Sequence, residues 1–257
     1  MSRADGPLLS RRSVLGGLGA ASLVTLVGCS TNPQLGRQQL ILVDEAQLDE
    51  MGVAAWRDIR RQERVSRNPE LNRRIERIGT RIVRAAGLED LYDWEYAVFE
   101  NEQANAFALP GGKIGVNTGL IRLAKSDDEI AAVVGHEVAH VTSRHSAERV
   151  SQAMASELGV SLAQLGLGGG ETTAALLGAG LQYGVLLPYS RRQEYEADRL
   201  GLRFAAAAGY DPRAALTFWQ TMAQQEQRGQ PVEFLSTHPA DANRIAALQE
   251  ELRAMGY

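Results

Sequence analysis

The chain has 257 residues, of which 44% are hydrophobic and 23% charged, and its formal net charge is −4 at pH 7. These values are typical of a soluble globular protein and argue against a disordered or fibrous chain. An acidic chain without a basic patch or a nucleic-acid-binding motif is not expected to bind nucleic acid. Cys29 is the only cysteine, which excludes an internal disulfide.

Residues 1–28 have the pattern of a bacterial export signal. Arginines near the start precede an apolar segment from Val14 to Val27, and its length of about 14 residues is short for a membrane-spanning helix. Leu26-Val27-Gly28-Cys29 resembles a lipobox, in which the cysteine is lipidated and becomes the first residue of the mature protein. The alternative is an uncleaved anchor helix followed by a buried cysteine.

Two further features concern the export route and the destination. Ser10-Arg11-Arg12-Ser13-Val14-Leu15 is similar to a twin-arginine signal, with an ordinary secretory leader as the alternative. Ser30, rather than an aspartate, follows Cys29, and this resembles a lipoprotein that is passed on to the outer membrane. We therefore expect a periplasmic domain that is anchored to the outer membrane through Cys29.

The rest of the chain is predicted to be a polar tether over residues 29–43, with no clear period, followed by one domain over residues 44–257. The domain opens with two helices at about 45–62 and 69–86, each beginning near an Asp or Asn that can cap it. Strands are predicted at 94–99, 106–109 and 114–116. The last two form a hairpin around Pro110-Gly111-Gly112-Lys113.

The clearest helix begins with the capping box Ser126-Asp127-Asp128-Glu129 and is predicted to run to about Glu148. The Ala-, Leu- and Gly-rich residues that follow are predicted to form a helical flap at about 150–189. Three more helices are expected at 191–208, 212–228 and 241–255. The fold class is therefore α+β and mainly helical, with a small sheet.

The capped helix contains His136-Glu137-Val138-Ala139-His140. Histidines four residues apart lie on one face of a helix and can reach one metal ion, with the glutamate beside them to accept a proton from an attacking water. This is the pattern of zinc metallopeptidases; two surface histidines on an amphipathic helix are the alternative. His145, nine residues after His136, is expected about 180° round the helix and away from the site.

A catalytic zinc needs a third protein ligand. Glu194 and Asp198 are four residues apart on a helix face whose other residues are small, and the first helix has a matching small face. The two helices are therefore expected to approach closely and to bring Glu194 to the metal. A solvated acidic pair is the alternative. The small residues are Ala132, Gly135, Ala139 and Ser143 on one helix and Ala197, Gly201 and Ala205 on the other.

Four segments together resemble the membrane-linked zinc metallopeptidases that include HtpX, LoiP and the CAAX prenyl proteases, a gluzincin group. They are Asn105 to Gly112, His136 to His140, Glu194 to Asp198, and His238-Pro239 with Arg244. The resemblance implies a zincin-type domain with one Zn²⁺ held by His136, His140 and Glu194. It also implies that Glu137 is the general base and that Asp198 orients a zinc-binding histidine.

Other residues have expected roles around this centre. His238 either stabilises the oxyanion or occupies the open metal position and keeps the enzyme latent, and Arg244 would assist the first role by donating to the developing charge. The strand from Asn105 through Ala106, Phe107 and Ala108 to Leu109 is expected to pair with an extended substrate, with an ordinary hairpin strand as the alternative.

The expected function is that of an outer-membrane-anchored zinc endopeptidase that degrades misfolded or unassembled envelope proteins. A zinc-containing assembly factor or chaperone with latent proteolysis is the alternative. An integral-membrane protease is disfavoured because the sequence lacks several long apolar spans. The sequence gives no expectation for an oligomeric state.

Overall fold

The computed structural model describes residues 29–165, 189–230, 232–239 and 242–257. The predicted leader and most of the predicted flap lie outside these ranges. The helices are α2 (Glu45–Gln62), α3 (Pro69–Ala85), α4 (Thr118–Leu123), α5 (Asp127–Thr142), α6 (His145–Leu165), α8 (Arg191–Ala207), α9 (Arg213–Gln227), α10 (Glu233–Thr237) and α11 (Ala242–Ala254). The strands are β1 (Cys29–Asn32), β2 (Arg37–Leu40), β3 (Glu95–Phe99), β4 (Ala106–Leu109) and β5 (Lys113–Asn117). The predicted mainly helical α+β class is confirmed.

The first two predicted helices form close to their expected bounds because their first turns are capped. The side chain of Asp44 accepts a hydrogen bond from the backbone N–H of Gln47 at the start of α2. Asn68 does the same for Glu70 at the start of α3, where Pro69 needs no partner for its nitrogen. These caps fix where each helix begins.

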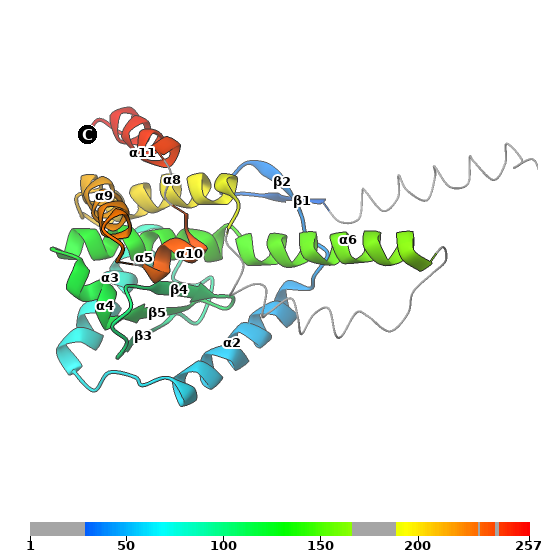
Figure 1. The fold of residues 1–257 in the computed structure, drawn as a ribbon, viewed down its shortest axis with the longest axis horizontal. Helices are drawn as coiled ribbons and strands as arrows, with labels where there is room; N and C mark the ends of the chain where they lie inside the picture. Colours follow the sequence, from blue (N-terminus) through cyan, green and yellow to red (C-terminus); the bar gives the residue numbers. More distant parts are fainter. Residues whose placement is uncertain (1–28, 166–188, 231, 240–241) are drawn as a thin grey trace, which may run out of the picture.

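A three-stranded sheet with the order β3-β5-β4 lies between α2 and α5 (Figure 1). β4 and β5 form the predicted antiparallel hairpin, and its turn places Gly111 and Gly112 at φ of 79° and 75°, which glycine adopts without strain. β3 joins β5 in parallel. Strand β4 is therefore an edge strand, and its outer edge pairs with no other strand of this sheet.

Helices α5 and α8 cross at their small faces, as the sequence predicts. A Cβ atom on Gly201 would lie 2.9 Å from the backbone nitrogen of His136, so only glycine fits there. Gly135 faces the backbone oxygen of Gly201 from the opposite helix in the same way. The close approach brings the two helices that carry the predicted metal ligands side by side.

Two sequence expectations are wrong. Residues 29–40 do not form an irregular tether: β1 and β2 pair as an antiparallel hairpin, in which Asn32 and Gln39 are buried. Helix α5 does not run to Glu148 but ends at Thr142, and α6 begins at His145 after Arg144 adopts a φ of 56°. No helix in the described ranges is both long and apolar enough to cross a membrane.

Candidate active site

The two motif histidines lie together on the buried face of α5. Ser126 caps this helix by accepting a hydrogen bond from the N–H of Glu129. The Nε2 atoms of His136 and His140 are 3.0 Å apart, and both side chains are shielded from solvent. The four-residue spacing therefore turns both rings toward one point, as predicted.

Glu194 reaches the same point from the first turn of α8, which begins with a capping box between Ser190 and Gln193. Its Oε1 lies 3.3 Å from Nε2 of His140, and its Oε2 lies 3.6 Å from Nε2 of His136. His238, which follows α10, places its Nδ1 3.2 Å from Nε2 of His136 and 3.0 Å from Oε1 of Glu194. All four side chains are buried and offer ligand atoms within 4.8 Å of one another.

This donor set fits zinc. Ligand atoms at the corners of a tetrahedron with metal bonds of about 2.0–2.1 Å are roughly 3.3 Å apart. The two histidine nitrogens are 3.0 Å apart, and each has a different oxygen of Glu194 at 3.3 or 3.6 Å. Burial and the neighbouring His136 lower the pKa of His140 and favour its neutral, metal-binding form. Burial alone would raise the pKa of Glu194, but His238 and Arg244 outweigh it and keep this carboxylate ionised.

Behind the histidines, Asp198 and Arg244 support the set. Oδ1 of Asp198 lies 2.9 Å from Nδ1 of His136, which fits the predicted orienting role. Arg244 binds Asp198 through two nitrogens at 2.6 and 2.8 Å and approaches Oε2 of Glu194 at 2.5 Å. Its guanidinium is buried over the ring of Trp219. The expectation that Arg244 donates to an oxyanion is not met, because its nitrogens face these carboxylates.

Glu137 lies on the other side, next to a cavity. Burial raises the pKa of its carboxyl group, and its Oε1 lies 3.4 Å from Nε2 of His238. Neither carboxylate oxygen makes a well-aligned hydrogen bond to a described residue. The cavity measures about 170 Å³ and is lined by Glu137, Tyr189, Thr237, His238 and the stretch from Asn105 to Ala108 at strand β4. The predicted substrate strand and the predicted base therefore face one space.

Sequence reasoning missed two residues of the site. The ring of Tyr189 stacks on His140 with centroids 3.7 Å apart, and its only sequence signal is its place before the cap of α8. His145 was expected to point away, but its Nδ1 lies 2.9 Å from Nδ1 of His140. The break at Arg144 turns it back, and neither a glycine nor a proline marks that break.

A family model described as peptidase family M48 matches residues 69–252, which include all of these site residues. The chain belongs to this family. The mitochondrial metalloendopeptidase OMA1 of Schizosaccharomyces pombe is 40% identical over 179 residues, which cover 69% of this chain and 52% of the relative. OMA1 of Saccharomyces cerevisiae is 36% identical over 214 residues, which cover 77% of this chain and 60% of the relative. The beta-barrel assembly-enhancing protease of Escherichia coli K12 is 28% identical over 240 residues (88% and 48%). The chain spans about half the length of the relatives it matches. The predicted family resemblance is confirmed.

Proposed function

We propose that this M48 chain is a zinc endopeptidase that binds one zinc ion through His136, His140 and Glu194. The observation that carries this proposal is the buried set of donor atoms from His136, His140 and Glu194, with separations of 3.0–3.6 Å and the carboxylate of Glu137 beside them. A pure binding site has no need of an extra buried carboxylate. The metalloendopeptidase names of the relatives support the same activity.

The residues of the chain divide the chemistry between them. When bound, zinc supplies Lewis acidity that polarises the peptide carbonyl and favours deprotonation of water. Glu137 takes the proton of the attacking water and returns it to the leaving amine. Burial raises the pKa of Glu137, which makes its carboxylate a stronger base than an exposed glutamate. Asp198 holds His136 in place during this exchange.

Strand β4 is the proposed binding site for the substrate backbone. Its outer edge is unpaired within the three-stranded sheet and faces the cavity that contains Glu137. An extended peptide that adds to this edge has its carbonyl groups beside the metal ligands. Such binding uses backbone hydrogen bonds and favours unfolded segments over particular side chains.

His238 has two proposed roles, of which the geometry favours latency. Its Nδ1 completes the ligand set, at 3.2 Å from Nε2 of His136 and 3.0 Å from Oε1 of Glu194, where an attacking water must bind. The same position supports the alternative function, an assembly factor with latent proteolysis. Increased turnover by His238→Ala would indicate latency, whereas lost turnover with zinc retained would indicate stabilisation of the transition state.

The proposed location is the outer membrane, with the lipid on Cys29, and the proposed substrates are misfolded or unassembled envelope proteins. The lipobox-like Leu26 to Cys29 supports the anchor, and the name of the E. coli relative supports work on beta-barrel assembly. Membrane fractionation of Cys29→Ala tests the anchor: the variant should leave the membrane fraction. If it stays there as wild type does, the lipid is not what holds the chain.

The activity is tested with purified protein, zinc and casein as an unfolded substrate. We expect wild type to cut casein and Glu137→Gln to leave it intact, with equal zinc content in both. A chelator should abolish the wild-type activity, and added zinc should restore it. Equal cleavage by both proteins would refute the role of Glu137. Zinc binding without cleavage in either protein would favour the assembly factor.

A further inference from the structure

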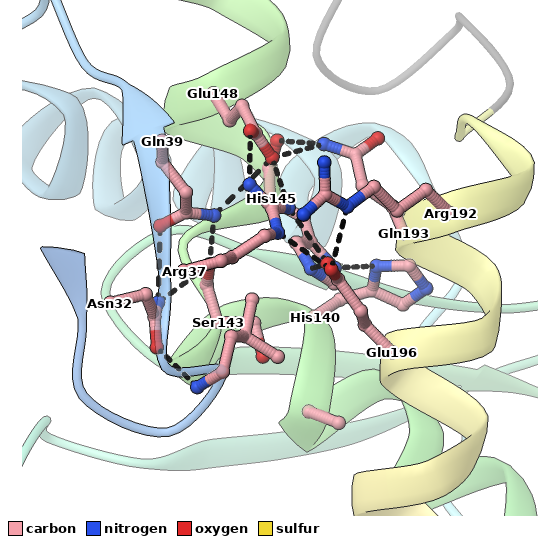
Figure 2. Close-up of polar contacts among 12 residues, drawn as sticks. Asn32, Arg37, Gln39, His140, Ser143, His145, Glu148, Arg192, Gln193 and Glu196 are labelled. Carbon is pink, nitrogen blue, oxygen red and sulfur yellow. Dashed lines mark hydrogen bonds and ion pairs between the residues drawn. The ribbon is translucent and has the colours of Figure 1, made fainter. Parts of the chain in front are cut away.

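A second polar cluster lies next to His140, in contact with Nδ1 of its ring (Figure 2). It combines Arg37 of the β1–β2 hairpin with His145 and Glu148 at the start of α6 and Glu196 of α8. His145 is fully buried, and the other three side chains are at least 87% shielded. The proposed chemistry uses none of these residues, so their role needs a separate explanation.

The hydrogen positions along this cluster follow from the metal site. A histidine that binds metal through Nε2 carries its proton on Nδ1. Nδ1 of His140 therefore donates to Nδ1 of His145 at 2.9 Å, and that atom must be unprotonated to accept. The proton of His145 is then on Nε2, 3.1 Å from the carboxylate of Glu196. Each ring nitrogen in these two contacts is therefore either a donor or an acceptor, and no two N–H groups face each other.

Arg37 holds the far end of this chain of hydrogen bonds. Its Nε and Nη2 donate to the two oxygens of Glu196 at 2.6 and 2.7 Å, and its Nη1 and Nη2 donate to Glu148 at 2.6 and 2.8 Å. Such paired contacts between a guanidinium and carboxylates fix the direction of the carboxylates as well as their distance. The hairpin thus sets the orientation of the Glu196 carboxylate, which accepts the hydrogen bond from Nε2 of His145.

The hairpin also stabilises the backbone break that brings His145 to His140. Arg144 is the only non-glycine residue with positive φ among the described residues, and this conformation costs about 1–2 kcal/mol. The carbonyl oxygen of Ser143 accepts hydrogen bonds from the side-chain amides of Asn32 and Gln39, at 3.0 and 2.8 Å. In a continuous helix His145 would lie on the far side of α5, without contact to His140.

From these contacts we propose that His145, aligned by Glu196 and Arg37, is a positioning residue for His140, and that the β1–β2 hairpin is part of the metal centre. His145 fixes the ring of His140 so that Nε2 points to the metal. This inference rests on the proposed function, because it takes His140 as a zinc ligand. It assigns the hairpin a role in metal binding in addition to any role near the membrane.

The test measures zinc affinity of the purified protein by competition with a chelator. His145→Leu removes the acceptor and should weaken zinc binding about 10- to 100-fold, the usual effect of losing such a partner. His145→Asn keeps an oxygen near the position of Nδ1 and should stay within about threefold of wild type. Val150→Ala, a buried change in the same helix, should lower stability and leave zinc affinity unchanged.

Three results would overturn the proposal: wild-type affinity in His145→Leu, equal losses in His145→Leu and His145→Asn, or an equal loss in Val150→Ala. If His145→Leu does not fold, Arg37→Met is measured instead, and unchanged affinity there would overturn the role of the hairpin. His140→Ala separates this proposal from the proposed function. Zinc binding that does not need His140 refutes the function itself, whereas binding that needs His140 but neither His145 nor Arg37 refutes only the positioning role.

Discussion

Gly201→Ala tests whether the contact between α5 and α8 controls the geometry of the proposed metal centre. The added Cβ would lie 2.9 Å from the nitrogen and 3.0 Å from the Cα of His136, and 3.1 Å from the carbonyl carbon of Gly135. All three are backbone atoms, so no side chain can move aside. Restoring a contact of 3.4 Å requires the helices to separate by about 0.5 Å.

The expected cost follows from two opposing effects. Overpacking of this kind costs about 1–3 kcal/mol, whereas replacing a helical glycine by alanine contributes about 1 kcal/mol in favour of folding. The net loss in the free energy of unfolding should be about 1 kcal/mol and at most about 2 kcal/mol. For a chain of this size, that lowers Tm by roughly 2–4 °C per kcal/mol.

The same separation should weaken zinc binding. Glu194 and Asp198 lie on α8 and the two histidines on α5, while metal sites tolerate errors of about 0.2 Å in ligand distance. We expect a loss of about tenfold or more in zinc affinity, measured by chelator competition, beside the change in urea unfolding. Gly79→Ala is the control, because its Cβ would clash with the ring of Tyr96 at the sheet. It should lower stability without changing zinc affinity.

A stability gain in Gly201→Ala would refute this reasoning. It would mean that the helices separate at no cost and that helix propensity alone changes the free energy of unfolding. Unchanged zinc affinity in a destabilised Gly201→Ala would show that the contact supports the fold but does not set the ligand positions. Equal losses of zinc affinity in Gly201→Ala and Gly79→Ala would mean that general loosening, and not this contact, weakens the site.

Three other substitutions test separate parts of the structure. Arg244→Met leaves the buried carboxylate of Asp198 without its cation and should cost about 3–5 kcal/mol in urea unfolding; a loss below about 1 kcal/mol would contradict the paired geometry. Asn68→Ala removes the cap of α3 and should cost about 1 kcal/mol in the same assay, with zinc affinity unchanged. Burial alone would raise the pKa of Glu148, but hydrogen bonds led by that from Arg37 lower it below 4.5. The stabilising contribution of the Glu148 carboxylate is therefore complete above pH 4.5 and is lost as the pH falls through its folded-state pKa. The difference in urea midpoint between wild type and Glu148→Gln should therefore shrink from about pH 7 to about pH 3.5. A constant difference would contradict the lowered pKa.

Much of the candidate metal site could be predicted because its determinants are local. The spacing of His136 and His140 sets their common face through helix geometry alone. The capping residue Ser126 sets where that helix begins. The facing small residues Gly135 and Gly201 predicted the approach of α8, since a side chain at either position would block it.

The parts that sequence reasoning missed depend on contacts between distant residues. The β1–β2 hairpin buries amides, at Asn32 and Gln39, so it leaves no alternating apolar pattern to read. The break at Arg144 depends on those same amides, more than 100 residues away in sequence, which donate hydrogen bonds to the buried carbonyl oxygen of Ser143 at the helix end. The position of His145 follows from that break and could not be foreseen from helical geometry.

Cys29 itself is part of the hairpin, where it pairs with Leu40, and this would limit how far a domain anchored at this cysteine could travel. A flexible tether over residues 29–43 would have an end-to-end distance of about 20 Å and would let the domain sample a broad shell above the bilayer. If Cys29 carries the proposed lipid, the folded body would instead begin at the headgroups, with almost no slack. Its search for substrates would then be a lateral, two-dimensional one along the membrane surface.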